Sequence, residues 1–124
     1  MIHLDTNVVI WFVTAQESRL SGPALQALLR EPPILSPIVV LELQLLHDIG
    51  RIPLEPEAVL ERLRSRVAME ISRTGFDRII SAARPLTWTR DPFDRLVCAA
   101  AIADGAGLIT SDRHIRQHLP SAIW

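Results

Sequence analysis

The segment DPFDRL, residues 91–96, places two aspartates three residues apart on either side of a Pro-Phe pair. Proline is favoured at the first helical position and aspartate at the N-cap before it, so Asp91 is predicted to cap a helix that starts at Pro92. Asp94 also gains from the positive end of that helix, but it shares a face with Val97 that is expected to be packed. A carboxylate on a packed face needs a partner. We therefore predict that Asp91 is mainly a helix cap and that Asp94 is a metal ligand.

Glu42 is a second acid in an apolar setting. It is the only formally charged residue between Glu31 and Asp48, and it lies within the run IVVLELQLL. A helix this apolar is largely buried, and an unpaired buried carboxylate is costly. A solvent-facing stripe shared with Gln44 and His47 would avoid that cost, but the three residues do not line up well at helical spacing. Glu42 is therefore a candidate ligand as well.

Two further acids come directly after apolar runs that read as strands. Asp5 follows residues 1–4, and Asp112 follows the run LIT at 108–110. An ordinary capping role explains each of them equally well, because acids often cap helices that begin at strand ends.

The elements that would position these acids alternate along the chain. Strands are expected at residues 1–4, 34–36, 69–72, 108–110 and 122–124, and helices at about 7–16, 22–30, 37–48, 56–66, 75–83, 92–104 and 111–119. Alternation of this kind predicts an α/β fold with a mainly parallel sheet and helices on both faces. We expect residues 1–124 to form one domain.

The predicted fold brings the acids together, because sites in parallel sheets form beyond the carboxyl ends of the strands. Four anions crowded at that edge would raise each other's pKa, and divalent cations would relieve the repulsion. Carboxylates and waters suit Mg²⁺ or Mn²⁺. Zinc is not expected, because the four histidines and one cysteine have no zinc-ligand spacing. The predicted ligands are Asp5, Glu42, Asp94 and Asp112.

Composition limits the function further. Apolar residues make up 48% and charged residues 22% of the chain, which is typical of a globular protein. The opening MIHLDTN has no basic region of a signal peptide and Cys98 has no cysteine to pair with, so the cytoplasm is the expected compartment. All 13 basic residues are arginine. The lack of lysine excludes P-loop nucleotide binding and Schiff-base chemistry.

Taken together, these segments resemble the PIN-domain ribonucleases, and most closely the VapC-type toxins of bacterial toxin–antitoxin pairs. The resemblance covers nearly the whole chain. It rests on LDTN at 4–7, Glu42 in its leucine-rich helix, RDPFDRLVCAAAIADGAGLITSD at 90–112 and the final AIW. DPFDRL followed by an alanine-rich helix and LITSD is specific, whereas LDTN alone is weak and residues 50–84 carry no diagnostic residue.

The resemblance implies a PIN-like three-layer α/β/α sandwich and a divalent-metal-dependent endoribonuclease that acts as a toxin. In that family four acids hold one or two Mg²⁺ or Mn²⁺ ions and are the catalytic residues, and they match the four acids named above. Asn7 and Thr110 match positions that support the site. Many relatives carry a histidine before the RDPFD run, where this chain has Thr89, so Thr89 is given no catalytic role.

The implied substrate is RNA cut at single-stranded positions, and an acidic site needs basic residues around it to bind RNA. Scattered solvated arginines are an equally good explanation of the candidates, which are Arg90, Arg95, Arg113 and Arg116. The family also implies a homodimer and an antitoxin whose tail lies along the first helices. The stretches Trp11–Phe12 and Leu25–Leu29 are candidates for that groove, although core packing is the first expectation for each of their residues, and Trp124 is expected to pack on the sheet edge.

Three other functions share some of these sequence features. A phosphatase of the haloacid-dehalogenase type needs a second aspartate, where this chain has Asn7, and a lysine. A dinucleotide-binding domain is suggested only by GAG at 105–107, which precedes a strand instead of following one. The main alternative is a catalytically inactive PIN-like module that binds RNA or protein, and the presence of all four acids argues against it.

Overall fold

A computed structural model describes all 124 residues. Its strands are β1 (Ile2–Leu4), β2 (Ile34–Leu35), β3 (Glu70–Ile71), β4 (Gly107–Ile109) and β5 (Ala122–Ile123). Its helices are α1 (Thr6–Val13), α2 (Gly22–Arg30), α3 (Pro37–Asp48), α4 (Pro56–Arg66), α5 (Phe76–Ala83), α6 (Pro92–Ala103) and α7 (Arg113–His118), with a short 3₁₀ turn at Glu17–Arg19. No helix is long and apolar enough to cross a membrane.

The five strands form one parallel sheet in the order β3-β2-β1-β4-β5. From the central β1 the chain winds outward through β2 to β3, then crosses back to β4 on the other side of β1 and ends at β5. The direction of winding therefore reverses between β1 and β4. In open α/β sheets this reversal point is where a crevice opens beyond the strand ends.

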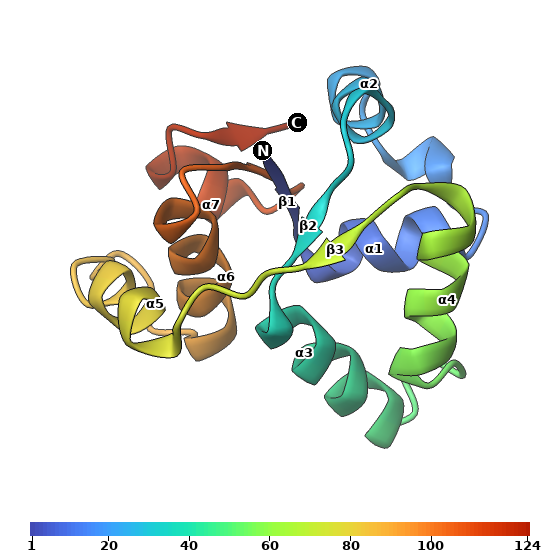
Figure 1. Cartoon of the computed structure of the whole chain (residues 1–124), viewed down its shortest axis with the longest axis horizontal. Helices are drawn as coiled ribbons and strands as arrows, with labels where there is room; N and C mark the ends of the chain where they lie inside the picture. Colours follow the sequence, from blue (N-terminus) through green and yellow to red (C-terminus); the bar gives the residue numbers. More distant parts are fainter.

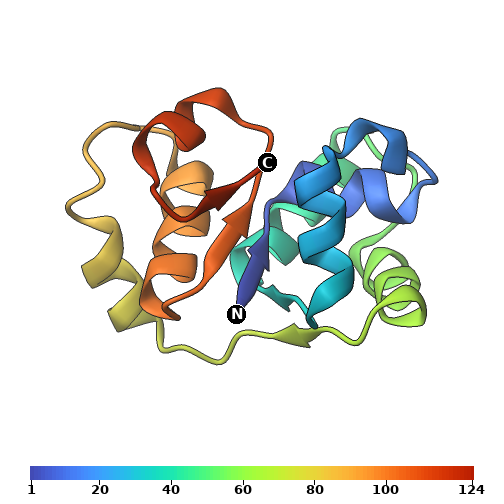
Figure 2. The same cartoon turned by 90° about the horizontal axis from the view of Figure 1, so that it is seen from above.

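Helices cover both faces of the sheet, as predicted. In Figures 1 and 2, α1, α2 and α4 lie on one side of the strands and α5, α6 and α7 on the other. Helix α3 contacts α1 and α4 on one side and α6 on the other, so it joins the two layers. The predicted α/β/α architecture is confirmed.

The predicted starts hold for the four helices that begin with proline in their first two positions, and most other boundaries shift by one to three residues. Ser36 and Asp91 are N-caps followed by proline, as expected. Helix α3 is followed by Gly50, whose φ of 77° is the left-handed conformation that glycine adopts without strain. The predicted strand at 69–72 is only Glu70–Ile71, and the helix predicted at 7–16 ends at Val13, before the 3₁₀ turn that the sequence pattern did not indicate.

Small side chains in α6 set how closely its neighbours pack. Ala99 and Ala100 are fully buried, and they form a separate apolar cluster with Ile79 and Ala83 of α5. A larger core cluster fills the space between the sheet and the other helices. Because alanine keeps the helix surface thin, α5 and α6 can approach closely, and the packed helix α6 holds Asp94 in a fixed position.

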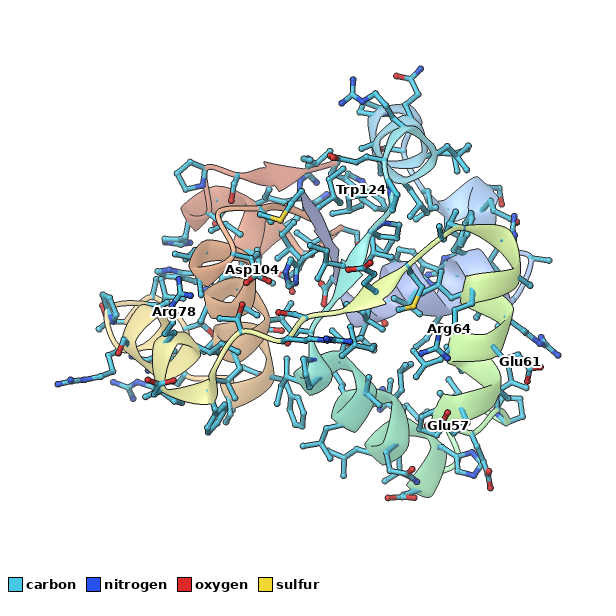
Figure 3. The ribbon with its side chains drawn as sticks, viewed as in Figure 1. Glu57, Glu61, Arg64, Arg78, Asp104 and Trp124 are labelled. Atoms are coloured by element: carbon cyan, nitrogen blue, oxygen red, sulfur yellow. The ribbon has the colours of Figure 1, made fainter.

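A second anchor lies where α6 ends. Asp104, the C-cap residue, accepts hydrogen bonds from Ser72 and Thr74 and lies 2.7 Å from His3 Nε2 on β1 (Figure 3). His3 is buried, and burial lowers its pKa, while Asp104 opposes that change. The Asp104 carboxylate thus links β1 and the segment after β3 to the end of α6.

Candidate functional site

Asp5 lies at the reversal point of the sheet. It follows β1, its backbone N–H bonds to the Ile109 carbonyl of β4, and its side chain caps α1 by accepting from the Thr6 N–H at 2.8 Å. The second carboxylate oxygen accepts from the Thr110 hydroxyl at 2.7 Å. Burial raises the pKa of Asp5, and the charge of Asp112 raises it further. An ionised Asp5 is therefore held in place by hydrogen bonds, but it has no neutralising partner.

Glu42 faces the same space from α3. Its carboxylate accepts a hydrogen bond from the buried Thr6 hydroxyl. Burial raises the pKa of Glu42; the Thr6 bond opposes this, and the charges of Asp5 and Asp91 add to it. Helix α3 is less buried than its apolar sequence predicted, because only Val39 and Leu43 of its side chains are buried. The Glu42 side chain nevertheless turns to Thr6 and the acid cluster.

Thr6 is a site residue that sequence reasoning missed. The sequence predicts for Thr6 only a possible share in capping α1, and the resemblance predicts Asn7 as the residue that supports the site. In the structure Asn7 is exposed and makes no side-chain hydrogen bond, while Thr6 connects to two of the acids. The only signal in the sequence is a β-branched hydroxyl directly after a strand-end acid, which many caps share.

Asp91 and Asp94 have different surroundings, and the structure confirms the role predicted for Asp91. Asp91 caps α6 by accepting from the backbone N–H groups of Phe93 and Asp94, at 2.9 and 3.1 Å. Asp94 makes no side-chain hydrogen bond or ion pair. Burial, followed by the charges of four neighbouring carboxylates with Asp91 first, raises the pKa of Asp94 to about 7. The cap prediction is confirmed, and Asp91 also adds its charge to the cluster.

Asp112 is the fourth predicted ligand, and it lies just after β4, the strand beside β1. It caps α7 by accepting from the Ile115 N–H at 2.9 Å, and its own N–H bonds to the Thr110 hydroxyl oxygen at 3.1 Å. Thr110 is fully buried and therefore ties Asp5 to the start of the segment that carries Asp112.

The cluster has more negative charge than the protein compensates. None of the four ion pairs in the structure involves any of its acids, which are Asp5, Glu42, Asp91, Asp94 and Asp112. Crowding like charges in a half-buried space without a cation is unfavourable, and a bound divalent ion offsets it. The donors are carboxylate oxygens, which are the ligands of Mg²⁺ and Mn²⁺. The residues present therefore fit such an ion, although no three of them are arranged as a ready-made metal site in this conformation.

Two neighbours of the acids are ruled out as reactive groups. Cys98, one turn after Asp94, is fully buried, and burial together with nearby aspartates raises the pKa of its thiol to about 12. It therefore stays protonated and is a poor nucleophile. The buried Thr89 hydroxyl accepts from the Asp91 N–H at 3.2 Å, which is a structural role.

The four arginines predicted to contact RNA separate into two groups. Arg95 donates to the Ala83 and Arg84 carbonyls at 2.9 and 2.8 Å, so its guanidinium holds the end of α5. Arg90, Arg113 and Arg116 are exposed and make no side-chain hydrogen bond or ion pair. These three are therefore free to bind an anion.

The apolar stretches predicted to form a partner groove are mostly core. Phe12 and Leu28 are 1% exposed. Trp11 and Leu25 are half-buried, and Leu29 is exposed. Of the apolar side chains in these two stretches, only these last three are accessible.

Comparison with known proteins gives consistent results. The family model described as PIN domain matches residues 2–118. The chain is 34% identical to Ribonuclease VapC22 of Mycobacterium tuberculosis, with 98% of this chain and 96% of that protein covered. A toxin-antitoxin complex from Klebsiella pneumoniae has a chain of similar fold, with a TM-score of 0.71, 18% identity, and coverage of 100% of this chain and 97% of the other. VapBC2 from Rickettsia felis, solved with a DNA fragment from its promoter, also matches, with a TM-score of 0.65, 20% identity, and coverage of 98% and 96%.

Proposed function

The chain belongs to the PIN-domain family, and we propose that it is a VapC-type endoribonuclease that uses Mg²⁺ or Mn²⁺ to hydrolyse RNA phosphodiester bonds, as the toxin of a toxin–antitoxin pair. The observation that carries the proposal is the convergence of four carboxylates at the reversal point of the sheet with no basic side chain to neutralise them. We expect residues 1–124 to act as one domain, in the cytoplasm where the RNA is.

The proposed ligands are Asp5, Glu42, Asp94 and Asp112. A divalent ion held by them would lower the pKa of a water molecule and offset negative charge on the phosphoryl group. Thr6 and Thr110 orient two of these carboxylates by donating hydrogen bonds to Glu42 and Asp5. Residues that hydrogen-bond to metal ligands fix the geometry of those ligands. Loss of either hydroxyl is therefore expected to lower metal affinity nearly as much as loss of an acid.

The substrate must be brought to an acidic centre, which repels RNA. The exposed guanidinium groups of Arg90 and Arg113 flank the acids in sequence, and neither has an acceptor within the protein. Arginine binds phosphate through two parallel hydrogen bonds. These residues are therefore proposed to hold the RNA backbone on either side of the scissile phosphate.

Two protein partners complete the proposal. One is an antitoxin, in keeping with the toxin-antitoxin complexes of similar fold. The other is a second copy of the chain. Exposed apolar residues gather on α3 and α5, where an apolar pocket of about 350 Å³ lies beside Phe76, which is itself 65% exposed. A two-fold axis here would let each copy place its Phe76 against the pocket of the other.

A cleavage assay tests the function. Wild type, Asp94→Asn and the exposed-surface control Glu61→Gln are incubated with cellular RNA in Mg²⁺, Mn²⁺ or EDTA, after circular dichroism has established that each is folded. We expect wild type and Glu61→Gln to cut RNA only with metal, and Asp94→Asn to be at least about 100-fold slower, as is typical when a metal ligand or its partner is lost. Folded wild type that leaves RNA intact with both metals would refute the nuclease and favour the inactive binding module.

A further inference from the structure

A pocket at the same edge of the molecule is not explained by metal chemistry. Arg113, Arg116, Gln117, Ala122 and Trp124 line a pocket of about 490 Å³ between α7 and β5. Its size lies within the range of small-ligand sites. No acidic side chain lines it, and the charged side chains that do line it are two arginines.

The pocket adjoins the acid cluster through the backbone. Arg113 directly follows Asp112 at the start of α7. Trp124 follows β5, and the Ile123 carbonyl accepts from the Thr110 N–H at 3.2 Å. Since β4 and β5 are parallel, Trp124 leaves the sheet at the edge where Thr110 and Asp112 leave it. A nucleotide in this pocket would therefore be next to a phosphate at the acids.

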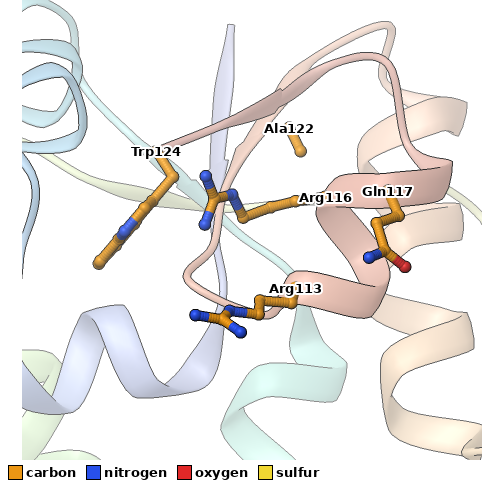
Figure 4. Close-up of a pocket in the computed structure, with 5 residues that line it drawn as sticks. All are labelled: Arg113, Arg116, Gln117, Ala122 and Trp124. Carbon is orange, nitrogen blue, oxygen red and sulfur yellow. The ribbon is translucent and has the colours of Figure 1, made fainter.

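The side chains in the pocket are arranged for contact with a ligand. Figure 4 shows the guanidinium groups of Arg113 and Arg116 both pointing from α7 toward the indole of Trp124. Neither guanidinium donates a hydrogen bond or forms an ion pair within the protein. Two adjacent cations without an acceptor repel each other, and an anion between them removes that cost.

Trp124 is half-buried and packs against the main core cluster, in line with the expectation that it packs on the sheet edge, and it also lines the pocket. Its support comes from Trp11, whose ring centroid lies 6.2 Å away at an interplanar angle of 57°. Trp11 in turn carries the Arg19 guanidinium 4.3 Å from its centroid. Trp11 therefore already has neighbours of its own, whereas Trp124 lines the open pocket.

We propose that this pocket binds one unpaired nucleotide of the RNA substrate beside the cleaved bond, with the base stacked on Trp124 and the adjoining phosphates bound by Arg113 and Arg116. An aromatic platform flanked by arginines is the usual chemistry of single-stranded nucleic-acid recognition. The inference rests on the proposed ribonuclease function. It assigns to Trp124 a role in choosing where single-stranded RNA is cut.

Binding is measured with fluorescein-labelled, single-stranded RNA of about 12 nucleotides, a length within the usual site sizes of such proteins. EDTA is present so that no cleavage occurs. Wild type is compared with Trp124→Ala, Trp124→Phe, the double variant Arg113→Ala/Arg116→Ala, and the control Arg64→Ala. Arg64 is an exposed arginine on α4, which lines no part of this pocket. Inorganic polyphosphate serves as a probe that has charge but no bases.

We expect Trp124→Ala to bind RNA about 5- to 100-fold more weakly, with Trp124→Phe recovering most of the affinity. Polyphosphate should bind Trp124→Ala and Trp124→Phe as tightly as it binds wild type. The double arginine variant should weaken both ligands and lower the slope of log affinity against log salt by roughly 1.4 for RNA. Because Trp124→Ala can fail to fold, tryptophan fluorescence is a second readout: RNA should quench wild type, and Trp124→Phe should lose most of that quenching while still binding.

The outcomes separate this inference from the function on which it rests. Unchanged RNA affinity in folded Trp124→Ala, or equal quenching in Trp124→Phe and wild type, overturns the nucleotide pocket and leaves a protein partner as its occupant. Wild type that binds RNA through Trp124 but cuts it with neither Mg²⁺ nor Mn²⁺ overturns the nuclease and the role of Trp124 in choosing the cut, while the nucleotide pocket itself stands. Wild type that binds no RNA at any salt concentration overturns both.

Discussion

The buried Thr6 hydroxyl donates a hydrogen bond to the carboxylate of Glu42, joining the first turn of α1 to the middle of α3. The same residue donates its backbone N–H to Asp5. One threonine thus connects two acids that come from different elements, the end of β1 and the middle of α3. This explains how a carboxylate in an otherwise apolar helix keeps one orientation.

Replacing Thr6 tests that role. Thr6→Val keeps the shape of the side chain but leaves Glu42 without its donor, so we expect the affinity for Mn²⁺ to fall about 10- to 100-fold. Thr6→Ser should restore most of it. Titration calorimetry measures the affinity, and urea unfolding reports stability, which should fall by only about 1 kcal/mol in Thr6→Val for one lost hydrogen bond. Equal Mn²⁺ affinity in Thr6→Val and wild type would show that the bond does not position Glu42.

Crowding of like charge predicts an unusual effect of metal on stability. Without metal at pH 8, Asp94→Asn should unfold at a higher temperature than wild type, because it removes one of several carboxylates that repel one another. Saturating Mn²⁺ should reverse the order by stabilising wild type, by about 2.7 kcal/mol at a metal concentration 100 times Kd. Differential scanning calorimetry with Mn²⁺ or EDTA measures both. If Mn²⁺ stabilises Asp94→Asn as much as wild type, then Asp94 is not a ligand.

Substitutions of Asp91 and of Asp94 should have different effects on thermal stability and on RNA cleavage. Asp91→Ala removes the acceptor for two backbone N–H groups of α6, and loss of an N-cap costs about 1 kcal/mol. Asparagine is also a good N-cap, so Asp91→Asn should keep most of the stability. Both variants should retain metal-dependent cleavage. An Asp91→Asn variant as inactive as Asp94→Asn would place Asp91 among the ligands.

These two residues also show how far the sequence alone could go. The Asp-Pro pair made the start of α6 predictable, because capping depends on a few neighbouring residues. Strand-end acids were found in the same way, from local pattern and the general geometry of parallel sheets. Thr6 was missed because its partner is 36 residues away, and Arg95 was assigned to the RNA because its bonds to the end of α5 depend on packing between helices. Such long-range contacts leave no periodic signal in one sequence.

The apolar surface of α3 and α5 predicts the oligomeric state. Phe76→Asp would place a charge in the proposed contact between two copies, where burial without a partner is unfavourable. We expect wild type to elute as a dimer in size-exclusion chromatography with light scattering and Phe76→Asp as a folded monomer. Leu29→Asp is the matched control, since Leu29 is similarly exposed, at 62%, but lies on α2. Monomeric wild type at micromolar concentration would refute the dimer.

The anchor at Asp104 predicts how stability depends on pH. Burial alone would raise the pKa of Asp104, but hydrogen bonds from Thr74, His3 and Ser72 outweigh it and lower the pKa below its usual value. An acid whose pKa is lowered by folding stabilises the protein above its unfolded pKa of about 3.9, and this contribution is lost as the pH falls through the folded value. Asp104→Asn should therefore be less stable than wild type at pH 7, by roughly 2 kcal/mol for bonds to a charged acceptor, and the difference should shrink toward pH 3.

Urea unfolding across this pH range measures the effect, with Glu61→Gln as the control. Glu61 is exposed on α4 and makes no side-chain hydrogen bond or ion pair, so its variant should follow wild type at every pH (Figure 3). Cleavage is not expected to respond selectively, because Asp104 contacts none of the four proposed ligands. A destabilisation of Asp104→Asn that stays constant from pH 7 to pH 3 would show that the variant loses stability through altered packing. The charge of the carboxylate would then not be what holds β1 to the end of α6.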